Sequence, residues 1–349
     1  MNYEPIKSRI VLISLEALGA VLRSTCLLKA IKRKYHDSHI TWITYPASKA
    51  LLQNNPLIDR IICVDGNTSA VINRLEFDIL FAVDKSLEAG ALAESIIAKE
   101  KYGFGLDRNG VIRPLNHLAN YQYDIGLDDN LKFFTNQKPE TQQITETMGL
   151  EWVRDPYVLE LTFSEKKEIE ERRIKALNGS LGIIGYNTGC SELYPYKKFT
   201  VNKSIELIHM WRKVFPALKI ALLGGKEDTL RQESIKEEFL KDPFVINTPT
   251  TEGLRSGLLW MATSDVVFTG CSLGLHMAIA LKKPVVCWFG VSCSQEIDLY
   301  DNGIKLQSKV SCSPCWKKSC EMEPKCFDQV SMDEIADATR LLFPLTAKT

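Results

Sequence analysis

The sequence predicts an α/β protein in which two Rossmann-like domains face an interdomain cleft. Two observations lead to this prediction. At 349 residues the chain is longer than most single domains, so two domains are expected. Strand-like and helix-like segments alternate over residues 8–100 and again from residue 181, an order typical of parallel sheets with right-handed crossovers.

The first half reads as strands separated by helical segments. Its expected strands are 9–15, 39–45, 60–64 and 77–83, and helical periodicity runs over 21–35. From residue 103 to about 161 the pattern weakens, and we expect a polar, loop-rich stretch. A charged helix at 163–176 could serve as the linker. The first domain is therefore expected to span residues 1–165.

The second half repeats the alternation. Its expected strands are 181–186, 218–223, 244–247, 265–269 and 285–289, and its expected helices are 204–214, 229–240, 253–261 and 272–281. A final helix, 332–343, is expected to cross back to the first domain. The second domain is thus assigned to residues 166–349. Ligands of such sheets bind beyond the carboxyl ends of the strands, so the loops that follow the strands should line the cleft.

Composition excludes several classes of function. Lysine plus arginine equals aspartate plus glutamate at 43 each, which leaves no basic field for nucleic acid. No apolar run approaches the roughly 18 to 20 residues that span a bilayer. The N-terminus lacks the basic-then-apolar order of a signal peptide. We therefore expect a cytoplasmic protein that binds no nucleic acid and has no transmembrane segment.

The strongest local signal is the segment from Gly270 to Ala278. It reads as the end of a strand, a glycine- and serine-containing turn and the start of a helix. Helix N-termini carry a partial positive charge and bind phosphate. The expected diphosphate site consists of Cys271, Ser272, Leu273, Gly274 and His276. The alternative is an ordinary α/β turn in which the imidazole binds a backbone carbonyl.

Two further loops of the second half suit a nucleoside diphosphate. Thr188 and Gly189 follow its first strand and precede Lys197, which offers a hydroxyl, backbone N–H groups and an ammonium group. The loop after the next strand ends in carboxylates, including Glu227, that can accept hydrogen bonds from ribose. Small-residue loops also follow most parallel strands, so an ordinary structural role is the alternative. The motifs of P-loop and nicotinamide-binding proteins are absent from the sequence.

Four segments together resemble glycosyltransferase family nine, the ADP-heptose heptosyltransferase family. They are Leu18–Thr25, Asn54–Ile62, Leu222–Gly225 and Gly274–Ala278. The match follows the family order over nearly the whole chain and implies the GT-B fold. Residues 123–129 and 294–300 are similar to the branch that includes bacterial autotransporter heptosyltransferases.

The resemblance implies transfer of heptose from ADP-heptose to a hydroxyl group, with inversion at the anomeric carbon. The acceptor is expected to be lipopolysaccharide core or a protein, bound by the first domain, and the donor is expected in the second. Lys197 matches the family's phosphate lysine, Thr188 its phosphate hydroxyl and Glu227 its ribose carboxylate. Because the sequence contains no Asp-x-Asp motif, no catalytic divalent metal is expected.

Two positions depart from the family pattern. Ala20 stands where the family has the aspartate presumed to be the catalytic base, and alanine cannot accept a proton. Cys271 replaces a second family aspartate. Three readings stay open: activity lost by a natural or engineered change, a base relocated to Glu16, Glu296 or Asp298, or a paralogue that binds a nucleotide sugar or a partner without turnover.

Four cysteines form a cluster in the sequence, Cys312, Cys315, Cys320 and Cys326, with the spacing C-x2-C-x4-C-x5-C. In a chain that otherwise reads as cytoplasmic, this density predicts an all-sulfur structural metal site. Zinc is the default ion, and the autotransporter branch implies iron. The alternatives are reduced surface thiols or a redox protein. A projecting finger of this kind would also suit self-association into a homo-oligomer.

Overall fold

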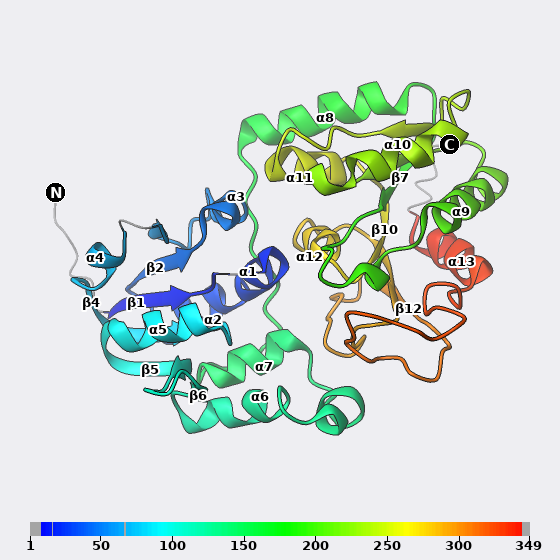
Figure 1. The fold of residues 1–349 in the computed structure, drawn as a ribbon. Coiled ribbons are helices and arrows are strands. Elements are labelled where there is room, and N and C mark those ends of the chain that lie inside the picture. Colours follow the sequence, from blue (N-terminus) through cyan, green and yellow to red (C-terminus); the bar gives the residue numbers. More distant parts are fainter. Residues whose placement is uncertain (1–7, 16, 66–67, 344–349) are drawn as a thin grey trace. The chain divides into compact units, whose positions relative to one another are not determined.

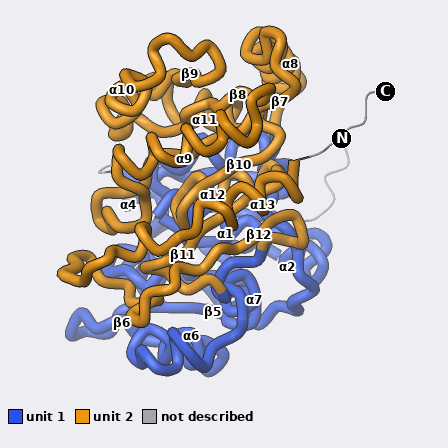
Figure 2. The backbone as a smooth tube through the Cα atoms, turned by 90° about the vertical axis from the view of Figure 1, so that its right-hand side faces the viewer, with its two compact units in different colours: residues 1–160, 295–298 blue, residues 161–294, 299–349 orange. Residues whose placement is uncertain are grey.

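The computed structural model of the protein describes residues 8–15, 17–65 and 68–343. The chain divides into two compact units, coloured separately in Figure 2. Unit 1 comprises residues 1–160 and 295–298, and unit 2 comprises residues 161–294 and 299–349. Each unit is a Rossmann-like α/β domain with its own, mainly parallel sheet, as the sequence predicts (Figure 1).

In the described part of unit 1, six strands form one sheet in the order β3-β2-β1-β4-β5-β6. The strands are β1 (Ser8–Ile13), β2 (Ser38–Thr44), β3 (Arg60–Cys63), β4 (Glu76–Ala82), β5 (Ile97–Leu106) and β6 (Ile112–Pro114). All neighbours pair in parallel except β6, which is antiparallel to β5. The chain reverses its direction of progress across the sheet between β1 and β4, and such a switch point is where open α/β sheets bind ligands.

The helices of unit 1 are short. They are α1 (Leu18–Ser24), α2 (Leu27–Lys34), α3 (Lys49–Leu52), α4 (Thr68–Ile72), α5 (Leu87–Ser95), α6 (Asn120–Asp124) and α7 (Glu140–Thr147). The single helix expected over 21–35 is in fact two, α1 and α2. Thr25 breaks it, because its hydroxyl donates to the carbonyl oxygen of Leu22 at 2.6 Å and accepts from the backbone N–H of Val158 at 2.9 Å.

The stretch from residue 103 to 161 was expected to be loop-rich, and this expectation is only partly right: residues 148–161 contain no helix or strand, but the rest contains several elements. It contains the end of β5, all of β6, helices α6 and α7, and a π-helical turn at Leu131–Thr135. The beginning of β5 carries charged residues and is partly exposed, so it lacks the apolar run that marks a buried strand.

Unit 2 contains, among the described residues, a parallel six-stranded sheet in the order β12-β11-β10-β7-β8-β9. The strands are β7 (Gly182–Asn187), β8 (Leu218–Leu223), β9 (Val245–Asn247), β10 (Val266–Gly270), β11 (Val285–Phe289) and β12 (Gly303–Gln307). The first five were predicted. The edge strand β12 was missed because only one of its residues is buried. The switch point of this sheet lies between β7 and β10.

The helices of unit 2 are α8 (Phe163–Leu177), α9 (Val201–Val214), α10 (Thr229–Glu238), α11 (Leu254–Ala262), α12 (Leu273–Ala280) and α13 (Met332–Leu342). The core beside the sheet is aromatic: the ring of Phe268 on β10 packs against those of Tyr186 and Trp211. Ile335 and Ala338 of α13 belong to the same core. The expectation that this last helix crosses to the first domain is corrected accordingly, because its buried face packs within unit 2.

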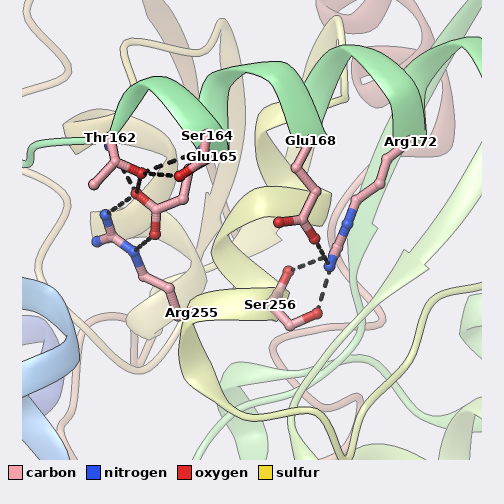
Figure 3. Close-up of polar contacts among 7 residues, drawn as sticks. All are labelled: Thr162, Ser164, Glu165, Glu168, Arg172, Arg255 and Ser256. Carbon is pink, nitrogen blue, oxygen red and sulfur yellow. Dashed lines mark hydrogen bonds and ion pairs between the residues drawn. The ribbon is translucent and has the colours of Figure 1, made fainter.

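Helix α8 begins with a capping box (Figure 3). The hydroxyl of Thr162 accepts from the backbone N–H of Glu165 at 3.2 Å, and the Glu165 carboxylate accepts from the N–H of Thr162 at 2.8 Å. Arg255 on α11 donates to both carboxylate oxygens of Glu165, at 2.6 and 2.8 Å. This guanidinium lowers the pKa of Glu165 to about 2. The contact joins α8 to α11.

We expect Glu165→Gln to weaken unit 2 in a pH-dependent way. Glutamine keeps the capping box but loses the ion pair, which costs about 1–3 kcal/mol at pH 7. A depressed folded pKa stabilises the fold above the unfolded value of 4.5, and this contribution disappears as the pH falls through about 2. Urea unfolding at pH 7 and pH 2.5 measures the difference, which should shrink at the lower pH.

The matched control is Glu171→Gln on the same helix. Its partner Lys167 lies 3.6 Å away and both side chains are about two-thirds exposed, so we expect a change within about 0.5 kcal/mol. An effect of Glu165→Gln that was equal at both pH values would contradict the assignment of the shifted carboxyl group.

Candidate functional site

The loops after β7 and β10 are tied together across the switch point of unit 2. The side-chain amide of Asn187, the last residue of β7, donates to the hydroxyls of Thr269 and Ser272 at 3.0 and 3.1 Å. It also donates to the carbonyl oxygen of Gly189 at 3.0 Å. Sequence reasoning placed Asn187 in the candidate loop after the first strand of this half but assigned it no role of its own. The sequence feature that could have identified Asn187 is its position as a polar residue at the carboxyl end of a buried strand.

Ser272 caps helix α12. Its hydroxyl accepts from the backbone N–H of Gly274 at 3.2 Å, which fixes the first turn. Cys271, Ser272 and Leu273 are half-buried, whereas Gly274 and His276 are buried. The predicted phosphate-binding residues are therefore brought together at one helix N-terminus, where the helix dipole favours an anion.

The backbone of Lys197 lies against the strand end that leads into this helix. It ends a 3-10 turn, Pro195–Lys197, and its carbonyl oxygen packs against Gly270, the last residue of β10. A Cβ atom on Gly270 would lie 2.0 Å from that oxygen, so only glycine allows the approach. The ammonium group of Lys197 lies 4.8 Å from the ring centre of Tyr194 and 3.9 Å from that of Trp316. The backbone of the predicted phosphate lysine thus lies against the end of β10, three residues before the predicted phosphate-binding helix begins.

We expect Gly270→Ala to separate the lysine from the helix. The new methyl group must displace the backbone of Lys197, which weakens both the fold and the binding of a phosphate group. The expected results are a loss of about 1–3 kcal/mol in urea unfolding and a loss of ADP affinity in calorimetry. Gly257→Ala is the control, because a Cβ atom there meets nothing within 4 Å and alanine favours the helix. Unchanged ADP affinity in a folded Gly270→Ala protein would contradict this account.

The loop after β8 packs against the loop after β7 through Asp228. A Cβ atom on Gly189 would lie 2.0 Å from the Asp228 carboxylate, so this glycine is needed for close packing. The pKa of Asp228 is raised above its usual value by burial. The backbone N–H of Gly225, which donates to the carboxylate at 2.9 Å, offsets part of this rise. Arg231 donates to the carbonyl oxygen of Thr188 at 2.9 Å. Asp228, one of the carboxylates that the sequence analysis offered to ribose, instead holds the two loops together. Arg231 is a positioning residue that the sequence analysis missed.

Thr188 and Glu227, the predicted contacts to the phosphate and the ribose of the nucleotide sugar, differ in their exposure to solvent. Thr188 is buried, and its hydroxyl donates to the carbonyl oxygen of Leu223 at 3.2 Å. Glu227 is exposed in the 3-10 turn Lys226–Asp228 that follows β8. Glu227 therefore presents its carboxylate to solvent at the carboxyl edge of the sheet, whereas Thr188 holds two strand ends together.

In unit 1 the carboxyl edge of the sheet is also organised around its switch point. Asp84, just after β4, accepts from the hydroxyl of Ser14 at 3.3 Å and from the backbone N–H of Leu15. This contact joins the ends of β1 and β4, and α1 begins shortly after β1. Ala20 is half-buried on α1, and Arg23 lies three residues later on the same helix face.

Arg23 connects α1 to a pair of carboxylates. It forms an ion pair with Glu140 at the start of α7, and the backbone N–H of Glu140 donates to the carbonyl oxygen of Glu296 at 2.8 Å. Glu296 is only 5% exposed. Burial and the neighbouring charge of Glu140 raise the pKa of Glu296 to about 7, against the opposing influence of Lys132, Arg23 and Lys85. Such a carboxyl group can exchange a proton near neutral pH.

The other two candidate bases differ from Glu296. Asp298 is engaged by Arg154, whose Nε and a terminal nitrogen donate to its two oxygens at 2.8 and 2.9 Å. Such a bidentate pair stabilises the carboxylate and suits a structural role. Glu16 lies outside the described residues. The geometry therefore favours Glu296 among the described candidates.

The four cysteines lie in one loop between β12 and α13. Each is partly exposed, and none of the four forms a disulfide. Burial raises the pKa of Cys326 to about 11, with further contributions from the charges of Cys315, Cys320 and Cys312. The other three thiols are thus within electrostatic range of Cys326. However, no three His, Cys, Asp or Glu side chains of the described residues are grouped closely enough to hold a metal ion.

Comparisons with known proteins address the resemblance directly. No family model matches the chain. Lipopolysaccharide heptosyltransferase 1 of Campylobacter coli is 23% identical over 305 residues, which cover 82% of this chain and 85% of that protein. None of the helices in the described ranges is long and apolar enough to pass through a membrane.

Solved structures share the fold. A family 9 glycosyl transferase from Veillonella parvula matches with a TM-score of 0.76 at 19% identity, covering 97% of this chain and 98% of that one. ADP-heptose lipopolysaccharide heptosyltransferase II of E. coli matches with a TM-score of 0.70 at 14% identity, covering 96% and 98%. Dodecameric iron-containing TibC, solved with ADP-D-beta-D-heptose, matches with a TM-score of 0.54 at 10% identity, covering 97% of this chain and 76% of TibC.

These comparisons confirm the resemblance predicted from the sequence. The chain is homologous to a lipopolysaccharide heptosyltransferase over most of its length, and its two Rossmann-like domains are consistent with the GT-B fold. The curated relative is a glycosyltransferase, which agrees with the enzyme class expected from the sequence.

Proposed function

From its homology to heptosyltransferases, we propose that the chain transfers heptose from ADP-heptose to a hydroxyl acceptor with inversion at the anomeric carbon. The observation that carries the proposal is the position of Lys197 against Gly270, beside the N-terminus of α12. An ammonium group and a helix N-terminus together suit a diphosphate. Unit 2 is accordingly the donor domain and unit 1 the acceptor domain.

Transfer requires charge stabilisation on the leaving group. The acceptor oxygen attacks the anomeric carbon as the bond to the ADP oxygen breaks, and ADP leaves with an additional negative charge. Lys197 and the α12 dipole would stabilise that charge. In this assignment the backbone at the start of α12 faces the diphosphate, through Cys271, Ser272, Leu273 and Gly274. His276 supports this helix start. The loop beside the diphosphate is shaped by Thr188 and Gly189. Glu227 binds the ribose hydroxyls. No divalent metal is assigned to this step.

The acceptor must lose a proton as it attacks. Glu296 takes this role in place of the aspartate that Ala20 replaces. A pKa of about 7 leaves a large fraction of the Glu296 carboxyl group ionised at neutral pH, and a base with such a pKa is well matched to its task. Arg23 and Glu140 keep the carboxyl group in place. The acceptor is proposed to be a glycan hydroxyl of lipopolysaccharide core, with a protein hydroxyl as the alternative.

Ala20 also supports a second candidate function. A protein that lacks the family aspartate and uses no other base would bind a nucleotide sugar, or a partner, without turnover. Two measurements separate the proposals. ADP binding in calorimetry tests the donor site, and heptose transfer by the unmodified chain and by Ala20→Asp tests for a base.

Transfer by the unmodified chain supports the relocated base. Activity that appears only in Ala20→Asp supports the binding protein instead. Failure of both proteins to bind ADP would refute the donor site itself.

The four cysteines fit a structural zinc or iron ion by their chemistry. Four thiolates supply an all-sulfur ligand set. The charges of the other three cysteines contribute to the raised pKa of Cys326, which indicates that they lie near it. We propose that Cys312, Cys315, Cys320 and Cys326 hold the ion, which would stabilise the loop without taking part in transfer. TibC is iron-containing and dodecameric, and by analogy this loop is a proposed site of self-association. Elemental analysis of the purified protein tests for the metal.

A further inference from the structure

Residues 312–326, here called the cysteine segment, lie against the turn that carries Lys197. Two contacts join them. The Nζ atom of Lys197 lies 3.9 Å from the ring centre of Trp316. The Sγ atom of Cys326 lies 3.8 Å from the carbonyl oxygen of Tyr196. The turn is therefore held by the cysteine segment at two successive residues.

A second ring also lies close to the ammonium group. The ring centre of Tyr194 lies 4.8 Å from Nζ of Lys197, and the rings of Tyr194 and Trp316 meet edge to face at 5.3 Å and 85°. A cation is attracted to the faces of aromatic rings. A lysine side chain is otherwise flexible, so this contact removes conformational freedom before any ligand binds.

The backbone of the cysteine segment sets the position of Trp316. Trp316 adopts a φ of 51°, a left-handed conformation that is costly for a residue other than glycine. Its N–H and that of Cys315 both donate to the carbonyl oxygen of Val291, at 2.9 and 3.1 Å. The hydroxyl of Ser313 donates to the carbonyl oxygen of Gly290 at 2.7 Å. The segment is thus fastened to the carboxyl end of β11, two strands from β7.

We propose that Trp316 is a positioning residue for Lys197, so that the cysteine segment controls the affinity of unit 2 for a nucleoside diphosphate. The inference rests on the proposed donor site of unit 2. The aromatic rings engage part of the ammonium group, and an ammonium group has three N–H donors. Those not directed at the rings bind phosphate oxygens, and the lysine is already ordered when the diphosphate arrives.

The test is a double-mutant cycle with ADP and adenosine as ligands, measured by calorimetry. Trp316→Leu should weaken ADP binding by about 2- to 30-fold and leave adenosine binding unchanged, because adenosine has no phosphate. Trp316→Phe keeps a ring and should weaken ADP binding less. In the Lys197→Gln background both substitutions should have no further effect, because the residue through which Trp316 acts is already gone.

Each other outcome is informative. ADP binding that is equal or tighter in Trp316→Leu, or a full effect that persists in Lys197→Gln, would overturn the inference. Equal losses for ADP and adenosine would also overturn it, because they indicate a general structural role. If Trp316→Leu fails to fold, the same cycle with Trp316→Phe decides. If the unmodified chain binds no ADP, the proposed donor site fails and the inference falls with it, whereas ADP binding without coupling refutes the inference alone.

Discussion

Replacing Glu296 with glutamine is expected to lower kcat by about 10²- to 10⁴-fold, the usual contribution of a general base. Glutamine preserves the shape of the side chain and its hydrogen-bonding capacity, but it cannot take a proton. The affinity for ADP should stay unchanged, because Glu296 belongs to unit 1 and the donor residues belong to unit 2. Transfer assays under saturating donor, combined with calorimetry, separate the two quantities.

The pH dependence provides an independent signature. With a pKa of about 7 for Glu296, the rate of the unmodified chain should rise with pH and level off above about 7, because only the carboxylate accepts a proton. The residual rate of Glu296→Gln should lack this step. Glu146→Gln is the matched control: Glu146 lies on α7 like Glu140, but it pairs with Lys138 at 2.6 Å. A Glu146→Gln loss as large as that of Glu296→Gln would argue against a specific base.

The same substitution should change stability in the opposite direction. The folded pKa of Glu296 is raised above the unfolded value of 4.5, so its relative stabilising contribution is complete below pH 4.5 and is lost as the pH rises through about 7. At pH 8 we therefore expect Glu296→Gln to unfold at a higher urea concentration than the unmodified chain. Below pH 4.5 this advantage should vanish. A variant that is less active yet more stable at pH 8 cannot owe its inactivity to unfolding.

Replacing Lys197 with glutamine is expected to weaken ADP binding by about 10- to 100-fold. A hydrogen bond to a charged group contributes about 1.5–3 kcal/mol, and each 1.4 kcal/mol corresponds to a factor of ten. Adenosine binding should be unaffected, and the salt dependence of ADP binding should decrease with the loss of the cation. Calorimetry with both ligands at low and high ionic strength measures these changes.

Lys203→Gln controls for the simple removal of positive charge. Lys203 lies on α9, where its ammonium group is 3.7 Å from Glu206 on the same helix. We expect ADP affinity to remain within about twofold of the unmodified chain, because the pair joins two residues of one helix, neither of them assigned to the donor site, and pairs of this spacing contribute little. If the two lysine variants lost ADP affinity equally, the special position of Lys197 beside α12 would be refuted.

Local patterns were sufficient to predict most elements of the sheets. Buried strands such as β1 and β8 each end in a run of four apolar residues, Ile10–Ile13 and Ile220–Leu223, so local composition identifies them. Elements with weak apolar patterns, such as β5 and β12, were missed because partner strands rather than composition stabilise them. The break between α1 and α2 was missed because Thr25 bonds to Val158, a contact distant in the sequence.

The sequence by itself determined which residues form the strands, which glycine-rich loops follow them, and that Lys197 and the start of α12 suit a phosphate. These properties depend on residues that are neighbours in the chain. Only the tertiary structure decided that Glu296, from a short segment inside the second half, packs with Arg23 and Glu140 of unit 1. The tertiary structure also brought the ring of Trp316 against the ammonium group of Lys197. Burial and charge pairing act between residues that are distant along the chain, so local patterns carry no record of them.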